Sequence, residues 1–239
     1  MGGRLSSGID GDVSIDGDVS TPGGTRVPPP VPVVAGRLGI LGGTFDPIHL
    51  GHLAIADEVR ERLGCERVLL IPAARPPHKP AEHVTPVEHR LSMVERAVAG
   101  LAGFEVSRIE LERAGPSYSV DTVAALASAA RAAGREPDLW FIVSGEAFRE
   151  LPTWREPGRL LELCRMVVVP RDGLPPPERG WIERHWPGAE ERVVFLDGPR
   201  VAVSATEIRA RVAARRSIRF LVPPAVAAYI ADHGLYTDP

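Results

Sequence analysis

From Arg37 onwards, short apolar runs alternate along the chain with longer amphipathic stretches. The runs are rich in aliphatic residues and are bounded by Gly, Pro or charged residues, which is typical of buried strands. They predict strands at RLGILGG (37–43), RVLLIPA (67–73), DLWFIVS (138–144), RMVVVP (165–170) and RVVFLD (192–197). FEVSRIELER (104–113) alternates apolar and polar residues, which also predicts a strand.

The stretches between these runs predict helices. Leu53, Ala56 and Val59 share one helical face with Leu63, and Gly64 ends that helix. Further helices are predicted at TPVEHRLSMVERAVAG (85–100), SVDTVAALASAARAAG (119–134), SATEIRARVAARR (204–216) and PPAVAAYIADHG (223–234).

Strands that alternate with helices predict an α/β fold, a Rossmann-like doubly wound parallel sheet with helices on both faces and a small helical C-terminal part. Residues 37–239 are expected to form one domain. Residues 1–36 hold a tandem IDGDVS repeat and a proline-rich stretch, so we expect a disordered leader there. The Asp-Gly-Asp units of the repeat lack the bidentate Glu of a calcium loop.

Composition excludes several function classes. The chain has 28 Lys plus Arg against 31 Asp plus Glu, and a formal net charge of -3 argues against bulk nucleic-acid binding. The sequence has neither an apolar run long enough for a membrane helix nor a secretion signal pattern. Cys65 and Cys164 have no metal or redox spacing, which favours buried thiols in a reducing compartment. We therefore expect a cytoplasmic protein without a nucleic-acid or membrane partner.

The stretch GGTFDPIHLGH (42–52) joins the first predicted strand to the first predicted helix. Ligands of doubly wound sheets bind at the carboxyl ends of the strands. Gly42 and Gly43 allow the backbone to approach a phosphate closely, and Thr44 adds a hydroxyl and an amide. Pro47 favours the start of a helix, whose N-terminal amides attract an anion. The alternative is a plain glycine turn.

His49 and His52 are three residues apart, so both imidazoles are expected on one face of the first helical turn. There they can donate to a bound anion. The pair could instead bind a metal, but a metal site needs a third ligand nearby and the sequence offers none. The stretch is neither a P-loop nor a G-x-G-x-x-G dinucleotide fingerprint.

These residues resemble a known pattern. GGTFDPIHLGH is similar to the T/H-x-G-H signature of the nucleotidyltransferase superfamily, and VSATEIR (203–209) resembles its second signature. Within this superfamily, residues 37–236 resemble the bacterial nicotinate-nucleotide adenylyltransferases. Their landmarks are similar to PPHK (76–79), HRLSM (89–93), GPSYSVDT (115–122), LPTW (151–154) and LVPPAVAAYIADHGLY (221–236).

The resemblance implies transfer of AMP from ATP to nicotinate mononucleotide, which gives deamido-NAD and pyrophosphate in NAD biosynthesis. The attacking phosphate is already an anion, so the reaction requires positioning and charge neutralisation rather than a general base. The partners implied are ATP and nicotinate mononucleotide. Mg²⁺ is expected on the ATP phosphates, with no protein metal site.

The resemblance also implies a role for each matching residue. Catalytic contacts to the phosphates are expected from His49, His52 and Arg209, with His52 as the transition-state contact. The residues expected to bind ATP are Gly42, Gly43, Thr44, Phe45, Glu146, Ser204 and Thr206. Those expected to bind the mononucleotide are Lys79, Thr85 and Trp154, whose ring would stack on the pyridine.

Several of these residues have a structural alternative, and two positions depart from the family. Thr85 could be only a helix cap, completed by Glu88 as a capping box, and Trp154 only a core or rim aromatic. Lys79 and Arg209 could be solvated charges. Glu146 stands where the family usually has an Asp that reaches the adenosine ribose, and Arg-Asp-Gly (171–173) replaces the usual Arg-Pro-Gly.

Two other functions stay open on the sequence alone. The acceptor could be nicotinamide mononucleotide or phosphopantetheine, or the protein could be a nucleotide sensor without catalysis. An aminoacyl-tRNA synthetase is disfavoured because the chain is short and lacks the Lys-rich second signature. Whether the chain forms a homo-oligomer is also left open.

Overall fold

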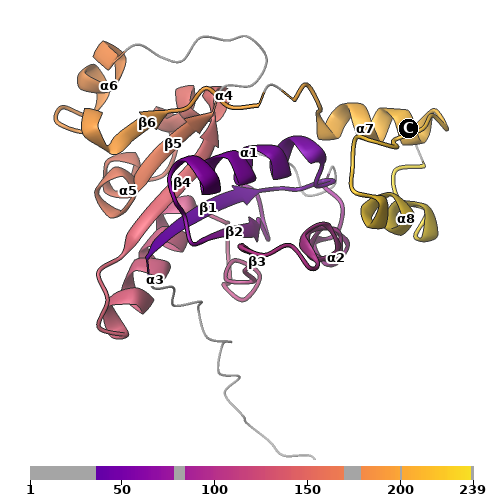
Figure 1. Cartoon of the computed structure of the whole chain (residues 1–239), viewed down its shortest axis with the longest axis horizontal. Helices are drawn as coiled ribbons and strands as arrows, with labels where there is room; N and C mark the ends of the chain where they lie inside the picture. Colours follow the sequence, from indigo (N-terminus) through magenta and orange to yellow (C-terminus); the bar gives the residue numbers. More distant parts are fainter. Residues whose placement is uncertain (1–35, 78–83, 170–178, 200, 238–239) are drawn as a thin grey trace, which may run out of the picture.

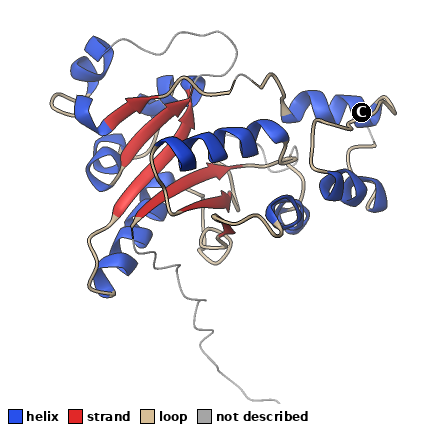
Figure 2. Ribbon diagram, in the orientation of Figure 1, coloured by secondary structure: helices blue, strands red, loops and turns tan. Residues whose placement is uncertain are grey.

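The computed structural model describes residues 36–77, 84–169, 179–199 and 201–237. Within them, a parallel sheet has the strand order β3-β2-β1-β4-β5-β6, and helices lie on both of its faces (Figure 1, Figure 2). This confirms the predicted doubly wound α/β fold. The predicted leader, Lys79 and residues 171–173 lie outside the described residues.

The element bounds are as follows. The strands are β1 (Arg37–Gly43), β2 (Arg67–Pro72), β3 (Phe104–Val106), β4 (Asp138–Ser144), β5 (Arg165–Val169) and β6 (Val193–Phe195). The helices are α1 (Leu50–Arg62), α2 (Val87–Val98), α3 (Ser119–Ala132), α4 (Gly145–Arg149), α5 (Pro157–Leu163), α6 (Arg179–His185), α7 (Ala205–Ala213) and α8 (Pro224–Asp232), with 3-10 turns η2 (Leu151–Thr153) and η3 (Glu190–Arg192).

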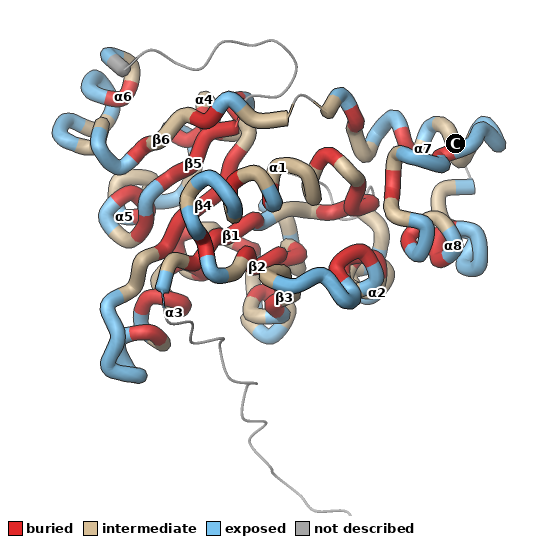
Figure 3. Tube along the Cα trace, in the orientation of Figure 1, coloured by how far each residue is buried: buried red, intermediate tan, exposed pale blue. Residues whose placement is uncertain are grey.

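The sheet separates two hydrophobic cores, because successive strand residues point to opposite faces. Leu38 and Ile40 of β1 pack in the core that α3 and α5 cover. Leu41 packs in the other core, beneath α1 and α2, to which α7 and α8 also contribute. Figure 3 shows the buried residues running along the strands and the exposed ones on the outer sides of the helices.

The strand order places the switch point between β1 and β4. From β1 the chain moves outward through β2 and β3, then returns to β4 on the other side of β1 and moves outward through β5 and β6. β1 and β4 pair in parallel, with Leu38 opposite Leu139. Their carboxyl ends therefore border a crevice of the kind in which doubly wound folds bind ligands.

The predicted strand 104–113 is too long. β3 ends at Val106, and the ladder closes where the Ser107 amide donates to the Leu70 carbonyl at 3.0 Å. The Leu111 amide then donates to the Arg108 carbonyl at 2.9 Å, which folds the following residues into turns. The alternation that suggested a strand instead buries Glu110.

The predicted capping by Thr85 is also wrong. α2 begins at Val87 after Pro86, and no side chain caps it. The Thr85 amide donates instead to Asp46 Oδ2 at 3.1 Å, a contact between distant segments that helix propensity does not reveal. Similarly, Pro47 does not begin a helix but lies in a turn before α1.

Both cysteines are buried free thiols, as predicted. Burial raises the pKa of Cys65 to about 11 and that of Cys164 to about 12, so neither is a reactive thiolate near neutral pH. Among the described residues, no helix has the length and apolar character needed to cross a membrane.

Candidate active site

The first turn of α1 brings the two predicted histidines together. His49 is the N-cap, and its backbone N–H donates to Nδ1 of His52 at 3.2 Å. The two rings stack with centroids 3.7 Å apart, which confirms the predicted common face. Because Nδ1 of His52 accepts this bond, we assign the proton of the neutral ring to Nε2, which is thereby a donor.

Small and aromatic neighbours fix the two rings. Phe45, buried and with a left-handed φ of 49°, meets His52 edge-on at a centroid distance of 5.0 Å. A Cβ at Gly43 would lie 3.2 Å from the Phe45 ring, and a Cβ at Gly51 would lie 3.0 Å from Nδ1 of His49. Glycine at both positions therefore leaves the space in which these rings lie.

The second predicted signature docks against the first. Ser204 caps α7 by accepting the Glu207 amide at 3.1 Å. Arg209 donates from Nη1 to the Asp46 carbonyl at 2.7 Å and from Nη2 to Oγ1 of Thr206 at 3.4 Å. We call His49, His52, Ser204, Thr206 and Arg209 the α1-side cluster.

A buried network supports the turn between β1 and α1. Asp46 is only 4% exposed, and its carboxylate accepts bonds from the Thr85 amide at 3.1 Å and the Tyr236 hydroxyl at 2.7 Å. Arg90, only 1% exposed, donates to the carbonyls of Thr44 at 2.7 Å and of Thr85 at 2.8 Å. Together these bonds hold the turn from both sides.

Burial also changes the protonation properties of this network. It lowers the pKa of the Arg90 guanidinium, although Asp46 opposes the change. Burial and then the negative charge of Asp46 raise the pKa of Tyr236, so its hydroxyl stays protonated and able to donate.

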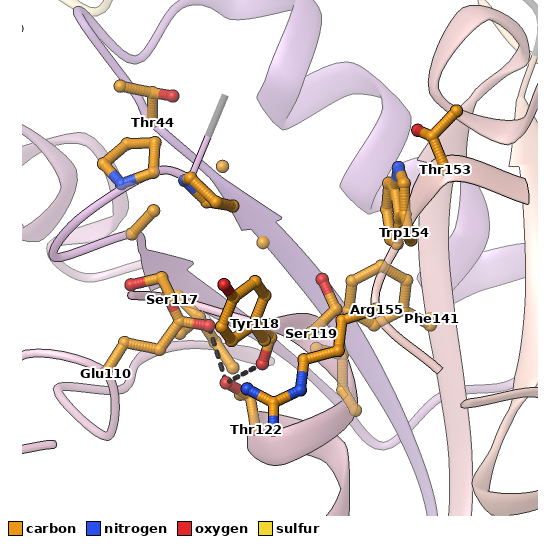
Figure 4. A pocket seen from close by; sticks show the side chains of 17 residues that line it. Thr44, Glu110, Ser117, Tyr118, Ser119, Thr122, Phe141, Thr153, Trp154 and Arg155 are labelled. Atoms are coloured by element: carbon orange, nitrogen blue, oxygen red, sulfur yellow. Dashed lines mark hydrogen bonds between the residues drawn. The ribbon is translucent and has the colours of Figure 1, made fainter. Parts of the chain in front are cut away.

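A cavity of about 600 Å³ lies on the α3 face of the sheet. The turn 42–44 forms one end of it, and Figure 4 shows Thr44 at that end and Arg155 at the other. The segment Ser117–Ser119 leads into α3 and lines the wall, and Trp154 lies edge-on to Phe141 at 6.1 Å. We call this space the α3-side cavity.

The start of α3 suits an anion. Tyr118 is the N-cap and Ser119 the first helical residue, and both line the α3-side cavity. The first amides of a helix have no partner inside it, and its positive N-terminal dipole favours negative charge. An acidic group of a ligand in the cavity can therefore be held here without a lysine.

Beside this helix start, Glu110 forms a buried polar group. It accepts a bond from Oγ1 of Thr122 at 2.7 Å (Figure 4). Arg113 donates to the same Oγ1 at 3.2 Å. Burial raises the pKa of Glu110, while the hydrogen bonds from Thr122 and Ser117 and the charge of Arg113 oppose this rise. The carboxyl therefore keeps its proton to a higher pH than an exposed glutamate does.

Comparison with known proteins identifies the family. A cytidylyltransferase-like family profile matches residues 40–211. A probable nicotinate-nucleotide adenylyltransferase of Roseiflexus sp. (strain RS-1) is 48% identical over 203 residues, 83% of this chain and 97% of that relative. One of the same name from Thermus thermophilus is 46% identical over 200 residues, 84% of this chain and 99% of that relative. This chain belongs to the nicotinate-nucleotide adenylyltransferase family.

A solved structure of an adenylyltransferase with a similar name shares the fold. The Plasmodium falciparum nicotinic acid mononucleotide adenylyltransferase complexed with NaAD aligns with a TM-score of 0.69 over 86% of this chain and 99% of that one. Its sequence is only 16% identical, so the likeness concerns the fold. The family fold therefore extends across the described sheet and the C-terminal helices.

In this member of the nicotinate-nucleotide adenylyltransferase family, most of the predicted site residues fall into three groups. The α1-side cluster contains five of them, as defined above. Gly42, Gly43, Thr44 and Trp154 line the α3-side cavity. Phe45 lies between the two, buried against His52.

The remaining predicted residues lie elsewhere. Thr85 is held behind the turn by Asp46 and Arg90 and does not line the α3-side cavity. Glu146 is exposed in the first turn of α4, outside the lining of that cavity. Within the described ranges, no group of three or more His, Cys, Asp or Glu side chains could hold a metal ion.

Sequence reasoning missed several residues of the site. Tyr118, Ser119 and Thr122 lie within the landmark GPSYSVDT, and Arg90 lies within HRLSM, so the landmarks contained the signal. The sequence did not show which of these side chains face the site in the folded protein. An arginine is normally exposed, so the burial of Arg90 was not foreseeable from its type.

Proposed function

We propose that this protein transfers AMP from ATP to nicotinate mononucleotide, giving deamido-NAD and pyrophosphate. The observation that carries the proposal is that a cluster of hydrogen-bond donors and an elongated cavity meet at one glycine turn. The α1-side cluster suits phosphates, and the α3-side cavity suits a flat ring with an acidic substituent. Family membership supports the same reaction.

The α1-side cluster is proposed to hold the ATP phosphates. An oxygen of the mononucleotide phosphate forms a bond to the α-phosphorus, while the bond from that phosphorus to the bridging oxygen breaks. Pyrophosphate leaves with the electron pair, so no proton has to be removed. Nε2 of His52, together with His49 and Arg209, would neutralise the charge that develops on the leaving group.

The α3-side cavity is proposed to hold the mononucleotide. Trp154 would stack on the pyridine, and the amides at Ser119 would bind its carboxylate. This assigns to the start of α3 the contact that the sequence assigned to Thr85. The neutral amide of nicotinamide mononucleotide would place its NH₂ against a donor, at a cost of roughly 1–3 kcal/mol. We expect at least a tenfold preference for the acid, since a free-energy difference of about 1.4 kcal/mol corresponds to a tenfold difference in affinity.

Mg²⁺ is proposed to enter on the ATP phosphates. The α1-side cluster offers donors rather than carboxylates, and the Asp46 carboxylate already accepts two bonds. When bound, Mg²⁺ would neutralise phosphate charge, while the residues of this chain orient the triphosphate. We place the reaction in the cytoplasm, a proposal that the two reduced, buried cysteines support.

The decisive experiment is pyrophosphate release with ATP, Mg²⁺ and a panel of acceptors. Nicotinate mononucleotide should be used at least ten times more efficiently than nicotinamide mononucleotide, and phosphopantetheine should not be used. Trp154→Ala should raise KM for the mononucleotide and leave KM for ATP nearly unchanged. Equal use of acid and amide would refute the acceptor assignment, and ATP binding without any release would favour a sensor.

A further inference from the structure

One cationic side chain, Arg155, occurs among the described residues that line the α3-side cavity. It directly follows Trp154, and its guanidinium carbon lies 4.7 Å from the centroid of the Tyr118 ring. Figure 4 shows Arg155 reaching from the segment after η2 toward Ser119 and Thr122. Its charge is therefore placed at the end of the cavity where α3 begins.

We propose that Arg155 is a specificity-determining residue that makes the enzyme prefer an acceptor with an anionic substituent on its ring. This inference rests on the proposed function, in which a pyridine mononucleotide occupies the α3-side cavity. It adds a side-chain charge to the backbone amides already proposed as the anion site. A negatively charged ring substituent gains from this charge, whereas a neutral carboxamide gains much less.

Two positive sources converge at this end of the cavity. The N-terminus of α3, a helix of 14 residues, supplies amides and a dipole, and Arg155 supplies a full charge. The only acidic side chain in the described lining is Glu110. Glu110 accepts the Thr122 hydroxyl, and Arg113 donates to the same hydroxyl, so Glu110 already faces a cation other than Arg155.

The present partner of Arg155 leaves it available for a ligand. Nε of Arg155 lies 3.5 Å from Oε1 of Glu156, but Oε2 of Glu156 also pairs with Arg159 at 3.1 Å. Glu156 therefore stays paired with Arg159 when Arg155 turns toward a bound anion. Both arginines are exposed, so added salt should weaken their interactions.

The test compares Arg155→Gln with Arg159→Gln. Both variants remove one positive charge that pairs with Glu156, but Arg159 does not line the cavity. Values of kcat and KM are measured for nicotinate mononucleotide and nicotinamide mononucleotide at saturating ATP. Arg155→Gln should lower the acid-to-amide ratio of kcat/KM by roughly fivefold, the upper end of the range for an exposed ion pair. Arg159→Gln should keep the ratio within about twofold.

Three readouts separate a specificity role from a structural one. The loss should lie in KM for the acid, with KM for ATP unchanged. Arg155→Lys should keep most of the ratio, because it keeps the charge. Raising NaCl should lower the ratio of the unmodified enzyme toward that of Arg155→Gln, whose own ratio should change little.

The outcomes distinguish this inference from the proposed function. An equal loss of kcat/KM with the acid and the amide would overturn the inference, since Arg155 would then bind a group that both acceptors share. An unchanged ratio in Arg155→Gln, with nicotinate mononucleotide still preferred, would overturn the inference alone. Failure of the unmodified enzyme to use either mononucleotide would overturn the proposed function itself.

Discussion

The Tyr236 hydroxyl donates a hydrogen bond to Oδ1 of Asp46 across 2.7 Å, joining residues that are 190 positions apart in the chain. Asp46 also accepts Arg209 on its backbone carbonyl at 2.7 Å. One buried residue thus ties the C-terminal end of the described chain and α7 to the turn that precedes the histidines. The last residues of the described chain therefore belong to the framework of the active site.

Tyr236→Phe should lower both stability and turnover. It removes one bond from a buried carboxylate, which costs roughly 1–3 kcal/mol, and loosens the turn that positions His49. Tyr229→Phe is the matched control, because its hydroxyl bonds Nδ1 of His89 at 3.0 Å between α8 and α2. Thermal melting and steady-state kinetics should show a loss of stability in both variants but a clear loss of kcat only in Tyr236→Phe. Equal kcat in the two would contradict a positioning role for Tyr236.

His52→Ala should lower kcat far more than it raises KM for either substrate. The ring is proposed to donate from Nε2 as charge develops on the leaving pyrophosphate, and loss of one such donor costs on the order of 10²-fold. His89→Ala, which removes a histidine at the α2–α8 contact, is the control and should keep kcat. Near-normal turnover of His52→Ala would leave this residue only a structural role.

Gly51→Ala should reduce activity without a matching loss of stability. The new Cβ would lie 3.0 Å from Nδ1 of His49, so the ring has to move, whereas alanine in a helix gains up to about 1 kcal/mol over glycine. Gly180→Ala in α6 is the control, since its Cβ would meet only the end of Arg184 at 3.5 Å. Kinetics and thermal melting of both variants would check this. Full activity of Gly51→Ala would show that the His49 ring position is not critical.

The apolar runs predicted every strand of the described sheet except β3, because a buried parallel strand favours continuous apolar residues, and alternation predicted β3. The end of β3 was not predictable in the same way, since the bonds within residues 107–111 decide it. The contacts of Asp46 were also hidden. They join segments distant in sequence, and neither periodicity nor propensity encodes such pairs. The histidine pair was predictable because its geometry is local to one helical turn.

Glu110→Gln should stabilise the protein relative to the unmodified chain as the pH rises. Burial raises the pKa of folded Glu110 above its ordinary value of 4.5, so the folded state binds its proton more tightly than the unfolded state does. The resulting stability is present below the unfolded pKa and is lost as the pH rises through the folded pKa. Glutamine keeps the acceptor for Thr122 and has no proton to lose.

Urea unfolding from pH 4 to pH 8 measures this effect. The free energy of unfolding of Glu110→Gln minus that of the unmodified protein should increase with pH and then level off above the folded pKa. Glu112→Gln, an exposed neighbour, controls for the loss of one carboxylate. A difference that stays flat with pH would contradict the prediction.

Removal of residues 1–36 should change neither activity nor melting temperature appreciably. Their composition offers no amphipathic pattern that could pack on the sheet, and the family profile begins only at residue 40. Kinetics and calorimetry of the shortened and full chains would be compared. A large fall in melting temperature would show that this segment docks onto the domain.

In the proposed arrangement, the switch point between β1 and β4 gives the two substrates separate halves of the molecule. His49 and His52 of the α1-side cluster follow the glycine turn along the chain, whereas residues 42–44 of that turn line the α3-side cavity. Substitutions that reshape the acceptor half can therefore accumulate while the nucleotide half stays intact. A fold arranged this way can diversify its choice of acceptor during evolution without rebuilding its phosphate chemistry.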